Sequence, residues 1–263
     1  FRHSLGKSQD DDILVYEEKD ETFSTFVYPS KSREYIMIGS SSTMATEYRF
    51  LSSKTPLEPF KIIQKRERGL EYSPSHVGDM FYILTNIDES TNFKLVKTPI
   101  SSTEKSNWKD VIPHREDVLI EDTDFFNDFM VIGERSNGLL KIRIKSWDGK
   151  EDYYLDLSSQ FDYDNETYSA SIGYNPNFQT NILRYNFTSL TTPYSVIDYN
   201  LITKDEQVQK QQEVLGGSFD SKNYTSERFF ATAHDGVQIP ISIVKHIDTE
   251  LNPNTPLLQY GYG

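Results

Sequence analysis

The residues of this sequence whose types and spacing could serve catalysis stand at its end, in the run Y-G-Y-G from Tyr260 to Gly263. They follow the apolar run 256–260 (P-L-L-Q-Y), which predicts a short buried strand. Glycines at the end of such a strand let the backbone turn sharply and lie close to a bound group. A phenolic hydroxyl placed there can donate to the oxyanion of a reacting carbonyl. Spacing alone favours a plainer interpretation, an ordinary strand-to-turn corner with tyrosine at its rim.

Other motifs of catalysis and metal binding are absent from the sequence. No G-x-S-x-G segment occurs, although the serine of an α/β-hydrolase needs that spacing for its strained turn. The five histidines show no H-E-x-x-H or other metal-ligand spacing, so we expect them to be structural. The chain has no cysteine, which excludes disulfides, thiolate nucleophiles and zinc–thiolate sites. We therefore expect no metal and no cofactor.

Two polar loops leave alternatives open. The acidic run Asp10–Asp12, before an apolar strand, is compatible with a calcium site, although a solvated turn is the plainer interpretation. The loop 112–117 (I-P-H-R-E-D) could face a central channel. Its plainer interpretation is a turn in which Arg115 pairs with a neighbouring carboxylate.

The charge balance limits the classes of partner. Lys and Arg number 27 against 40 Asp and Glu, a net charge of −13, so nucleic acid is not expected. Such a field attracts cationic substrates, but it is also common in proteins that are merely soluble. No apolar run approaches the roughly 18 residues of a membrane helix, and no membrane partner is expected. The lack of cysteine fits a reducing compartment, so we expect a cytoplasmic location, with the periplasm as the alternative.

A repeated pair of strands must position whatever chemistry the chain performs. Each repeat has an apolar run, a polar turn and a second run with alternating polarity. The first runs begin at Tyr35, Phe81, Phe129 and Ile182, at intervals of roughly 50 residues, the period of four-stranded propeller blades. One blade cannot cover both of its faces, so blades stack and share cores. The predicted class is all-β, a β-propeller with about four to five blades that form either a small closed ring or part of a larger one.

The last forty residues change the pattern. Two β-type runs, 229–233 and 237–244, flank His234–Gly236, and Asp-Gly between such runs predicts a hairpin with a tight primed turn. Gly216–Ser218 reads as a linker. We therefore expect a domain boundary between Leu215 and Tyr224, with propeller blades over 1–215 and a linker plus the start of a second domain over 216–263.

Several blocks of the sequence resemble the prolyl oligopeptidase family of serine peptidases, and within it the oligopeptidase B branch. The downstream blocks are 224–228 (Y-T-S-E-R), 231–237 (A-T-A-H-D-G-V) and 256–263 (P-L-L-Q-Y-G-Y-G). The upstream blocks are 15–18 (V-Y-E-E), 38–43 (I-G-S-S-S-T), 81–86 (F-Y-I-L-T-N), 111–118 (V-I-P-H-R-E-D-V) and 189–193 (S-L-T-T-P). The resemblance runs nearly the whole length. Gln259 is a mild departure, since an aliphatic residue is common there in the family.

The resemblance implies a seven-bladed propeller, present here as its later blades without the N-terminal ones, followed by the first strands of a truncated α/β-hydrolase domain. It implies a serine peptidase that cleaves short peptides after Arg or Lys, with the propeller restricting access. The catalytic Ser, Asp and His and the specificity acids lie downstream of these residues in the family. Of the family's catalytic positions, only the oxyanion-hole tyrosine has a match in this sequence, at Tyr262. Residues 1–263 alone are therefore expected to be inactive. The expected partners are basic peptides and the missing peptidase domain.

A second hypothesis is a non-catalytic propeller that binds peptides or proteins, because a fold does not fix a function. The sequence downstream of Gly263 discriminates the two, since a G-x-S-x-G segment there favours the enzyme.

Overall fold

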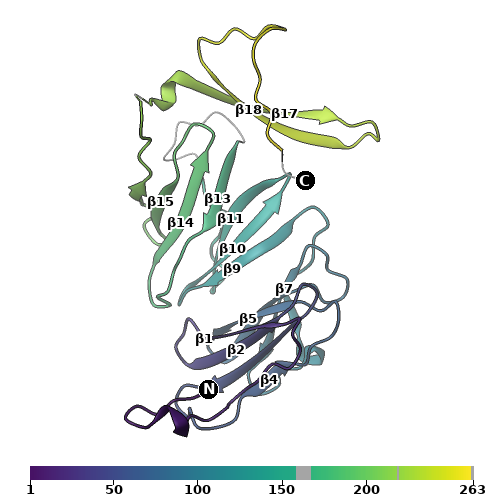
Figure 1. Cartoon of the computed structure of the whole chain (residues 1–263), viewed down its shortest axis with the longest axis vertical. Coiled ribbons are helices and arrows are strands. Elements are labelled where there is room, and N and C mark those ends of the chain that lie inside the picture. The colour runs from purple at the N-terminus through teal and green to yellow at the C-terminus, as the bar shows by residue number, and fades with distance from the viewer. Residues whose placement is uncertain (158–166, 218, 262–263) are drawn as a thin grey trace. The chain divides into compact units, whose positions relative to one another are not determined.

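The computed structural model describes residues 1–157, 167–217 and 219–261, and these are built almost entirely from antiparallel β-sheets (Figure 1). They form four four-stranded sheets and one two-stranded sheet. The chain divides into two compact units. The first comprises Phe1–Leu155 with Tyr174–Leu183, and the second comprises Asp156–Gly173 with Arg184–Gly263.

Three of the four-stranded sheets lie in the first unit, and each consists of four consecutive strands paired in chain order. The first sheet contains β1 (Ser24–Pro29), β2 (Tyr35–Ser41), β3 (Thr46–Ser52) and β4 (Lys61–Gln64). The second contains β5 (Tyr72–Val77), β6 (Met80–Thr85), β7 (Lys94–Pro99) and β8 (Lys109–Ile112). The third contains β9 (Leu119–Phe125), β10 (Phe129–Ser136), β11 (Leu139–Ser146) and β12 (Asp152–Tyr154).

The second unit holds nearly all of the fourth sheet and a separate hairpin. The fourth sheet contains β13 (Tyr168–Ile172), β14 (Ile182–Ser189), β15 (Ser195–Asn200) and β16 (Glu206–Gln211), and the hairpin contains β17 (Tyr224–Thr232) and β18 (Gln238–His246). The described helices are the 3₁₀ turns η1 (Gln9–Asp11), η2 (Lys105–Asn107) and η3 (Ser221–Asn223). None of the helices in the described part of the chain has the length and apolar character needed to cross a membrane.

The sheets of the first unit pack face to face and share their cores, as the repeat predicts. One cluster joins side chains of the first and second sheets, and the rings of Phe50 on β3 and Phe81 on β6 lie 5.1 Å apart between centroids. A second cluster joins the second and third sheets and includes Leu95 on β7 and Ile132 on β10, both fully buried. Repeated four-stranded meanders that share cores in this way are blades of a β-propeller. The all-β propeller class is therefore confirmed, and each four-stranded sheet is called a blade below.

The strands of the predicted repeat are present in every blade. The four apolar first runs are β2, β6, β10 and β14, and the second runs are β3, β7, β11 and β15. The apolar run of β10, Phe129–Ile132, is buried together with Gly133 and Glu134, because this strand pairs on both sides and is covered on both faces. The blades thus form where the sequence supplies an apolar central pair of strands.

The predicted hairpin is confirmed, but its predicted primed turn is wrong. β17 and β18 pair from Tyr224–His246 to Thr232–Gln238. The Ala233 amide donates to the Val237 carbonyl at 2.8 Å, which leaves a loop of His234–Gly236, and the Gly236 amide donates to the Ala233 carbonyl at 2.9 Å. Gly236 has a φ of 87°, whereas Asp235 is not among the residues with positive φ. A turn followed by one left-handed glycine is the usual alternative to a two-residue primed turn.

The predicted buried strand over 256–260 is also wrong. These residues form no strand, and Leu257 and Leu258 are 75% and 93% exposed. A strand needs a neighbouring strand for its amides and carbonyls, and the described residues pair none with this segment. The expected α/β-hydrolase strands stay a prediction, as does the domain boundary between Leu215 and Tyr224, which lies inside the second unit.

Candidate functional site

The predicted oxyanion tyrosine, Tyr262, lies outside the described residues. Its described neighbour Tyr260 is 89% exposed and belongs to no strand. The structure therefore leaves the role of Tyr262 as a prediction.

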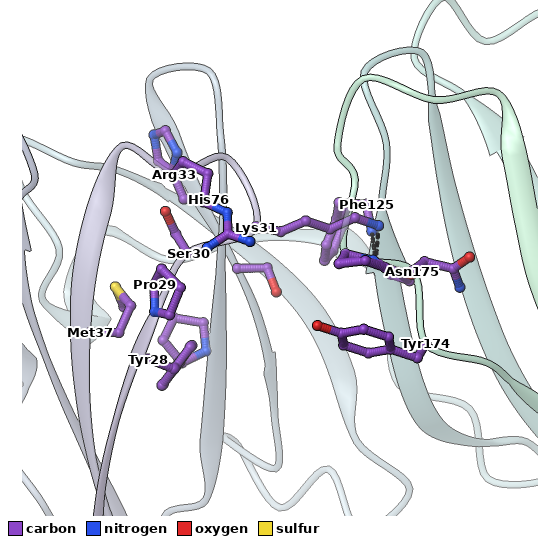
Figure 2. A pocket seen from close by; sticks show the side chains of 14 residues that line it. Tyr28, Pro29, Ser30, Lys31, Arg33, Met37, His76, Phe125, Tyr174 and Asn175 are labelled. Atoms are coloured by element: carbon purple, nitrogen blue, oxygen red, sulfur yellow. Dashed lines mark hydrogen bonds and ion pairs between the residues drawn. The ribbon is translucent and has the colours of Figure 1, made fainter.

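A pocket of about 360 Å³ lies in the first unit, where the first strands of three blades converge (Figure 2). Its walls come from β1 and the β1–β2 turn, from β5, from the end of β9 and from the segment 174–176. The lining residues are Tyr28, Pro29, Ser30, Lys31, Arg33, Met37, Pro74, Ser75, His76, Asp124, Phe125, Tyr174, Asn175 and Pro176. The lining thus combines an apolar, proline- and tyrosine-rich wall with a few charged groups, which is typical of small-ligand sites.

An ion pair between Lys31 and Asp124 crosses this pocket. The Lys31 Nζ lies 2.5 Å from Asp124 Oδ1 and 3.6 Å from the centroid of the Phe126 ring. Figure 2 shows the Lys31 side chain reaching from the β1–β2 turn toward the end of β9. The two side chains are only 19% and 17% exposed. The pair therefore ties the first blade directly to the third.

Burial opposes the charged form of both partners. Burial lowers the pKa of the Lys31 ammonium, although the Asp124 carboxylate opposes this shift. Burial likewise raises the pKa of Asp124, although the charge and hydrogen bond of Lys31 lower it. The attraction between the two charges therefore does not fully offset their loss of hydration.

A serine–histidine pair ties the first blade to the second at the same pocket. Ser32 Oγ lies 2.7 Å from His76 Nδ1 and 2.9 Å from Ser30 Oγ, and His76 is 4% exposed. Burial lowers the pKa of His76, so its imidazole is neutral at pH 7. Within the described part of the chain no carboxylate hydrogen-bonds to the other ring nitrogen. The pair therefore lacks the third group that orients a catalytic base, and its contacts are structural.

Arg115 pairs with a carboxylate, as the plainer interpretation of its loop predicts, but the partner lies on β10, 19 residues away, and is not a neighbour in the loop. Its Nη2 donates to Glu134 Oε1 at 2.6 Å, and Glu134 is 1% exposed. The same carboxylate accepts from the Tyr154 hydroxyl at 2.6 Å and from Arg143 at 3.3 Å. Burial raises the pKa of Glu134, but the bonds from Arg115 and Tyr154 outweigh it and keep the pKa below its usual value. This cluster ties the loop between β8 and β9 to the third blade.

A second charged cluster holds the segment that leads into β1. Glu18 Oε2 accepts from Arg66 Nη2 at 2.5 Å and from the Tyr16 hydroxyl at 2.6 Å. The guanidinium of Arg66 also lies 4.0 Å from the centroid of the Phe23 ring. Burial raises the pKa of Glu18, but these two bonds, a third from the Asp20 amide and the charge of Arg66 together lower it from 4.5 to about 2.

The acidic run near the N-terminus is a capped turn. Residues Gln9–Asp11 form η1, whose first turn is capped by Ser8, and Asp12 Oδ1 lies 2.6 Å from His3 Nδ1. Among the residues that the structure describes, no group of three or more His, Cys, Asp or Glu side chains could hold a metal ion.

The blades and their order match a known family. The sequence profile of the prolyl oligopeptidase N-terminal β-propeller domain matches residues 1–212. The chain is 38% identical over 262 residues to dipeptidyl aminopeptidase BI of Pseudoxanthomonas mexicana, a match that covers 99% of this chain and 35% of the relative. It is 30% identical over 263 residues to Protease 2 of Moraxella lacunata, covering 100% of this chain and 36% of the relative.

Solved structures agree with the sequence matches. Oligopeptidase B from Leishmania major superposes with a TM-score of 0.83 at 28% identity, over 94% of this chain and 35% of that one. Oligopeptidase B from Trypanosoma brucei, with covalently bound antipain, gives a TM-score of 0.83 at 29% identity, over 95% of this chain and 36% of that one. The chain thus spans about a third of the length of the relatives it matches. From the repeated blades and these matches together, the chain belongs to the prolyl oligopeptidase family and carries its N-terminal β-propeller domain.

Proposed function

We propose that this chain is the propeller-bearing portion of a serine oligopeptidase that cleaves short peptides after Arg or Lys. The observation that carries the proposal is that the matches extend beyond the blades. Relatives named as peptidases align with 99–100% of the chain, which includes the β17–β18 hairpin and the segment up to Gly263. The matched residues therefore continue past residue 212, where the match to the propeller domain ends.

The proposed chemistry is acyl transfer by a serine that lies in a peptidase domain outside these residues. A histidine takes the serine proton, and an aspartate orients that histidine. Tyr262 donates its hydroxyl to the oxyanion, and the propeller limits entry to short peptides. The net charge of −13 favours encounter with substrates that carry Lys or Arg.

A second candidate is removal of dipeptides from a free N-terminus. The relative with 38% identity carries the name dipeptidyl aminopeptidase BI, whereas the relative with 30% identity is named Protease 2. The two activities differ in whether the enzyme requires a free α-amino group two residues before the cleaved bond. The substrate's N-terminus therefore discriminates them.

The experiment compares hydrolysis of two chromogenic dipeptides ending in Arg by the full-length protein that carries these residues. One dipeptide has a blocked N-terminus and the other a free one, and norleucine replaces Arg in matched controls. We expect cleavage of the blocked Arg substrate and a loss of about 10²–10³ in kcat for Tyr262→Phe. Cleavage of the free-amine substrate alone would favour the dipeptidyl activity. If none of the four substrates is cleaved, the hypothesis of a non-catalytic binding propeller is favoured. If the Tyr262→Phe variant is as fast as wild type, Tyr262 has no role in the oxyanion site.

A further inference from the structure

Asp124 and Phe126 together form a cradle for a cation. A carboxylate beside the face of an aromatic ring is the arrangement that recognises an ammonium or guanidinium group. Phe126 is fully buried and Asp124 is 17% exposed, so a cation in the cradle is largely desolvated. In this structure the occupant is the chain's own Lys31, from the turn of a different blade.

The turn that carries Lys31 is held in place without the lysine side chain. Ser30 Oγ accepts from the Tyr35 amide at 3.1 Å, and Ser32 Oγ is bonded to His76 on the second blade. The Arg33 amide also donates to the Ser30 carbonyl at 2.8 Å and closes the turn. Lys31 can therefore leave the cradle by side-chain rotation alone, while the backbone of the turn stays where it is.

Space for a second cation lies beside the cradle. The adjoining pocket of about 360 Å³ falls in the size range of small-ligand sites. Figure 2 shows Tyr174 and Asn175 on the opposite side of this space from Tyr28 and Pro29. Arg33 also lines the pocket and disfavours an added cation. An exchange keeps a single cation beside Asp124, while the displaced Lys31 ammonium moves away from the carboxylate.

We propose that the Asp124–Phe126 cradle is a binding subsite for a basic peptide side chain, and that Lys31 is its displaceable internal occupant. The inference rests on the proposed function only in taking a basic peptide as the natural ligand. The attraction between Lys31 and Asp124 does not fully offset their loss of hydration, so releasing Lys31 into water costs less free energy. A side chain that brings its own apolar stem to the proline- and tyrosine-lined wall gains contacts in return.

The test measures binding rather than hydrolysis, so its outcome is independent of the peptidase assay. The probe is Nα-acetyl-arginine amide, and Nα-acetyl-citrulline amide is its uncharged isostere. In the full-length protein, Lys31→Ala is expected to bind the arginine probe about tenfold more tightly than wild type, because the cradle is empty. The affinity for the citrulline probe is expected to be the same in Lys31→Ala as in wild type. The double variant Lys31→Ala/Asp124→Asn is expected to lose the tighter binding of the arginine probe.

The control variant is Lys150→Ala, which removes the same charge from an exposed lysine whose side chain is 82% exposed. A folded Lys31→Ala variant that binds the arginine probe no better than Lys150→Ala would overturn the proposal. The proposal would also be overturned if Lys31→Ala still bound the arginine probe more tightly after Asp124→Asn was added.

A second measurement uses wild-type protein and does not depend on the folding of a variant. The arginine probe is expected to raise the rate at which an amine-reactive acylating reagent modifies Lys31, read by peptide mass spectrometry, while the citrulline probe leaves it unchanged. Equal modification of Lys31 with and without the arginine probe, at concentrations where binding is saturated, would show that Lys31 is a fixed tie between blades.

Discussion

Single carboxylates join segments of the first unit that are distant in sequence. Glu18 binds Arg66, Glu134 binds Arg115, and Asp124 binds Lys31, over separations of 48, 19 and 93 residues. Each carboxylate is largely buried, at 12%, 2% and 17% side-chain exposure. Removing one partner of such a pair leaves the other charge desolvated, so these residues matter for stability more than exposed pairs do.

Glu18 gives a pH-dependent prediction. Its pKa falls from 4.5 in the unfolded chain to about 2 in the fold, so its contribution is complete above 4.5 and is lost as the pH falls toward 2. We expect Glu18→Gln to lower the free energy of unfolding by about 1–2 kcal/mol at pH 7. The difference from wild type should shrink steadily between pH 5 and pH 3 in urea titrations.

The neighbouring exposed Glu17→Gln is the control and should match wild type at every pH. A difference between Glu18→Gln and wild type that is constant over this range would contradict the assigned role of the carboxylate.

Some of these ion pairs can be predicted from the sequence and others cannot. Arg115 sits in a loop dense in charge, so a carboxylate partner could be predicted, although Glu134 itself could not be chosen over the acids of the same loop. Lys31 and Asp124 are 93 residues apart and lie on elements that meet only when three blades assemble. No local pattern encodes that encounter. The pocket was missed in the sequence for this reason, although an aspartate beside two consecutive phenylalanines, Phe125 and Phe126, was a usable signal.

Among the elements, the central strands β2 and β10 each contain one glycine, and the surroundings of the two glycines differ. Gly39 on β2 lies beneath the rings of Phe26 on β1 and Tyr48 on β3. A Cβ at Gly39 would overlap the Phe26 ring and meet Tyr48 Cε1 at 2.9 Å. Gly133, at the corresponding place on β10, has its nearest neighbours at 3.7 Å or more. Gly39 and Gly133 thus occupy equivalent positions in their strands, but only Gly39 lacks room for a Cβ atom.

Gly39→Ala is therefore expected to destabilise the protein by about 1–3 kcal/mol, because the rings must shift. Gly133→Ala is the matched control and should be neutral or stabilising by about 0.5 kcal/mol, since alanine has less freedom to lose in a strand. Guanidinium denaturation of both variants checks the prediction. Combining Gly39→Ala with Phe26→Ala should recover part of the loss, and equal effects of the two glycine variants would contradict the packing argument.

Central strands were predictable from sequence because each is covered on both faces and reads as an apolar run. Edge strands were harder, since β16 is polar along most of its length and β5 contains Pro74 within a strand. The run 256–260 was predicted as a strand from its apolarity alone. Apolar residues form strands only where another strand supplies hydrogen bonds, and that condition cannot be read from the run itself.

At the scale of the whole molecule, shared cores make the blades of the first unit depend on one another. Phe81 lies in the core between the first two blades and is fully buried. Trp108 packs against the same core, whereas Trp147 packs against the core between the second and third blades. Since these are the two tryptophans of the sequence, each core has its own fluorescent reporter.

Phe81→Ala is expected to lower stability by about 3–5 kcal/mol, from the lost burial and the cavity left behind. Because the second blade belongs to both cores, the midpoints reported by Trp108 and by Trp147 should shift together. Trp147→Phe and Trp108→Phe backgrounds isolate the two signals during urea unfolding. A shift seen by Trp108 while Trp147 keeps its wild-type midpoint would show that the third blade unfolds independently.

The chain-order pairing of strands within each blade also has a consequence for synthesis. Every strand pair of a blade closes between neighbours in sequence, so a nascent polypeptide can complete one sheet soon after its fourth strand leaves the ribosome. The face of that sheet stays uncovered until the next fifty or so residues emerge and supply the adjoining blade. We therefore expect slow translation between blades to lengthen the exposure of an apolar surface, so that codon choice at the connections between β4 and β5 or between β8 and β9 affects soluble yield.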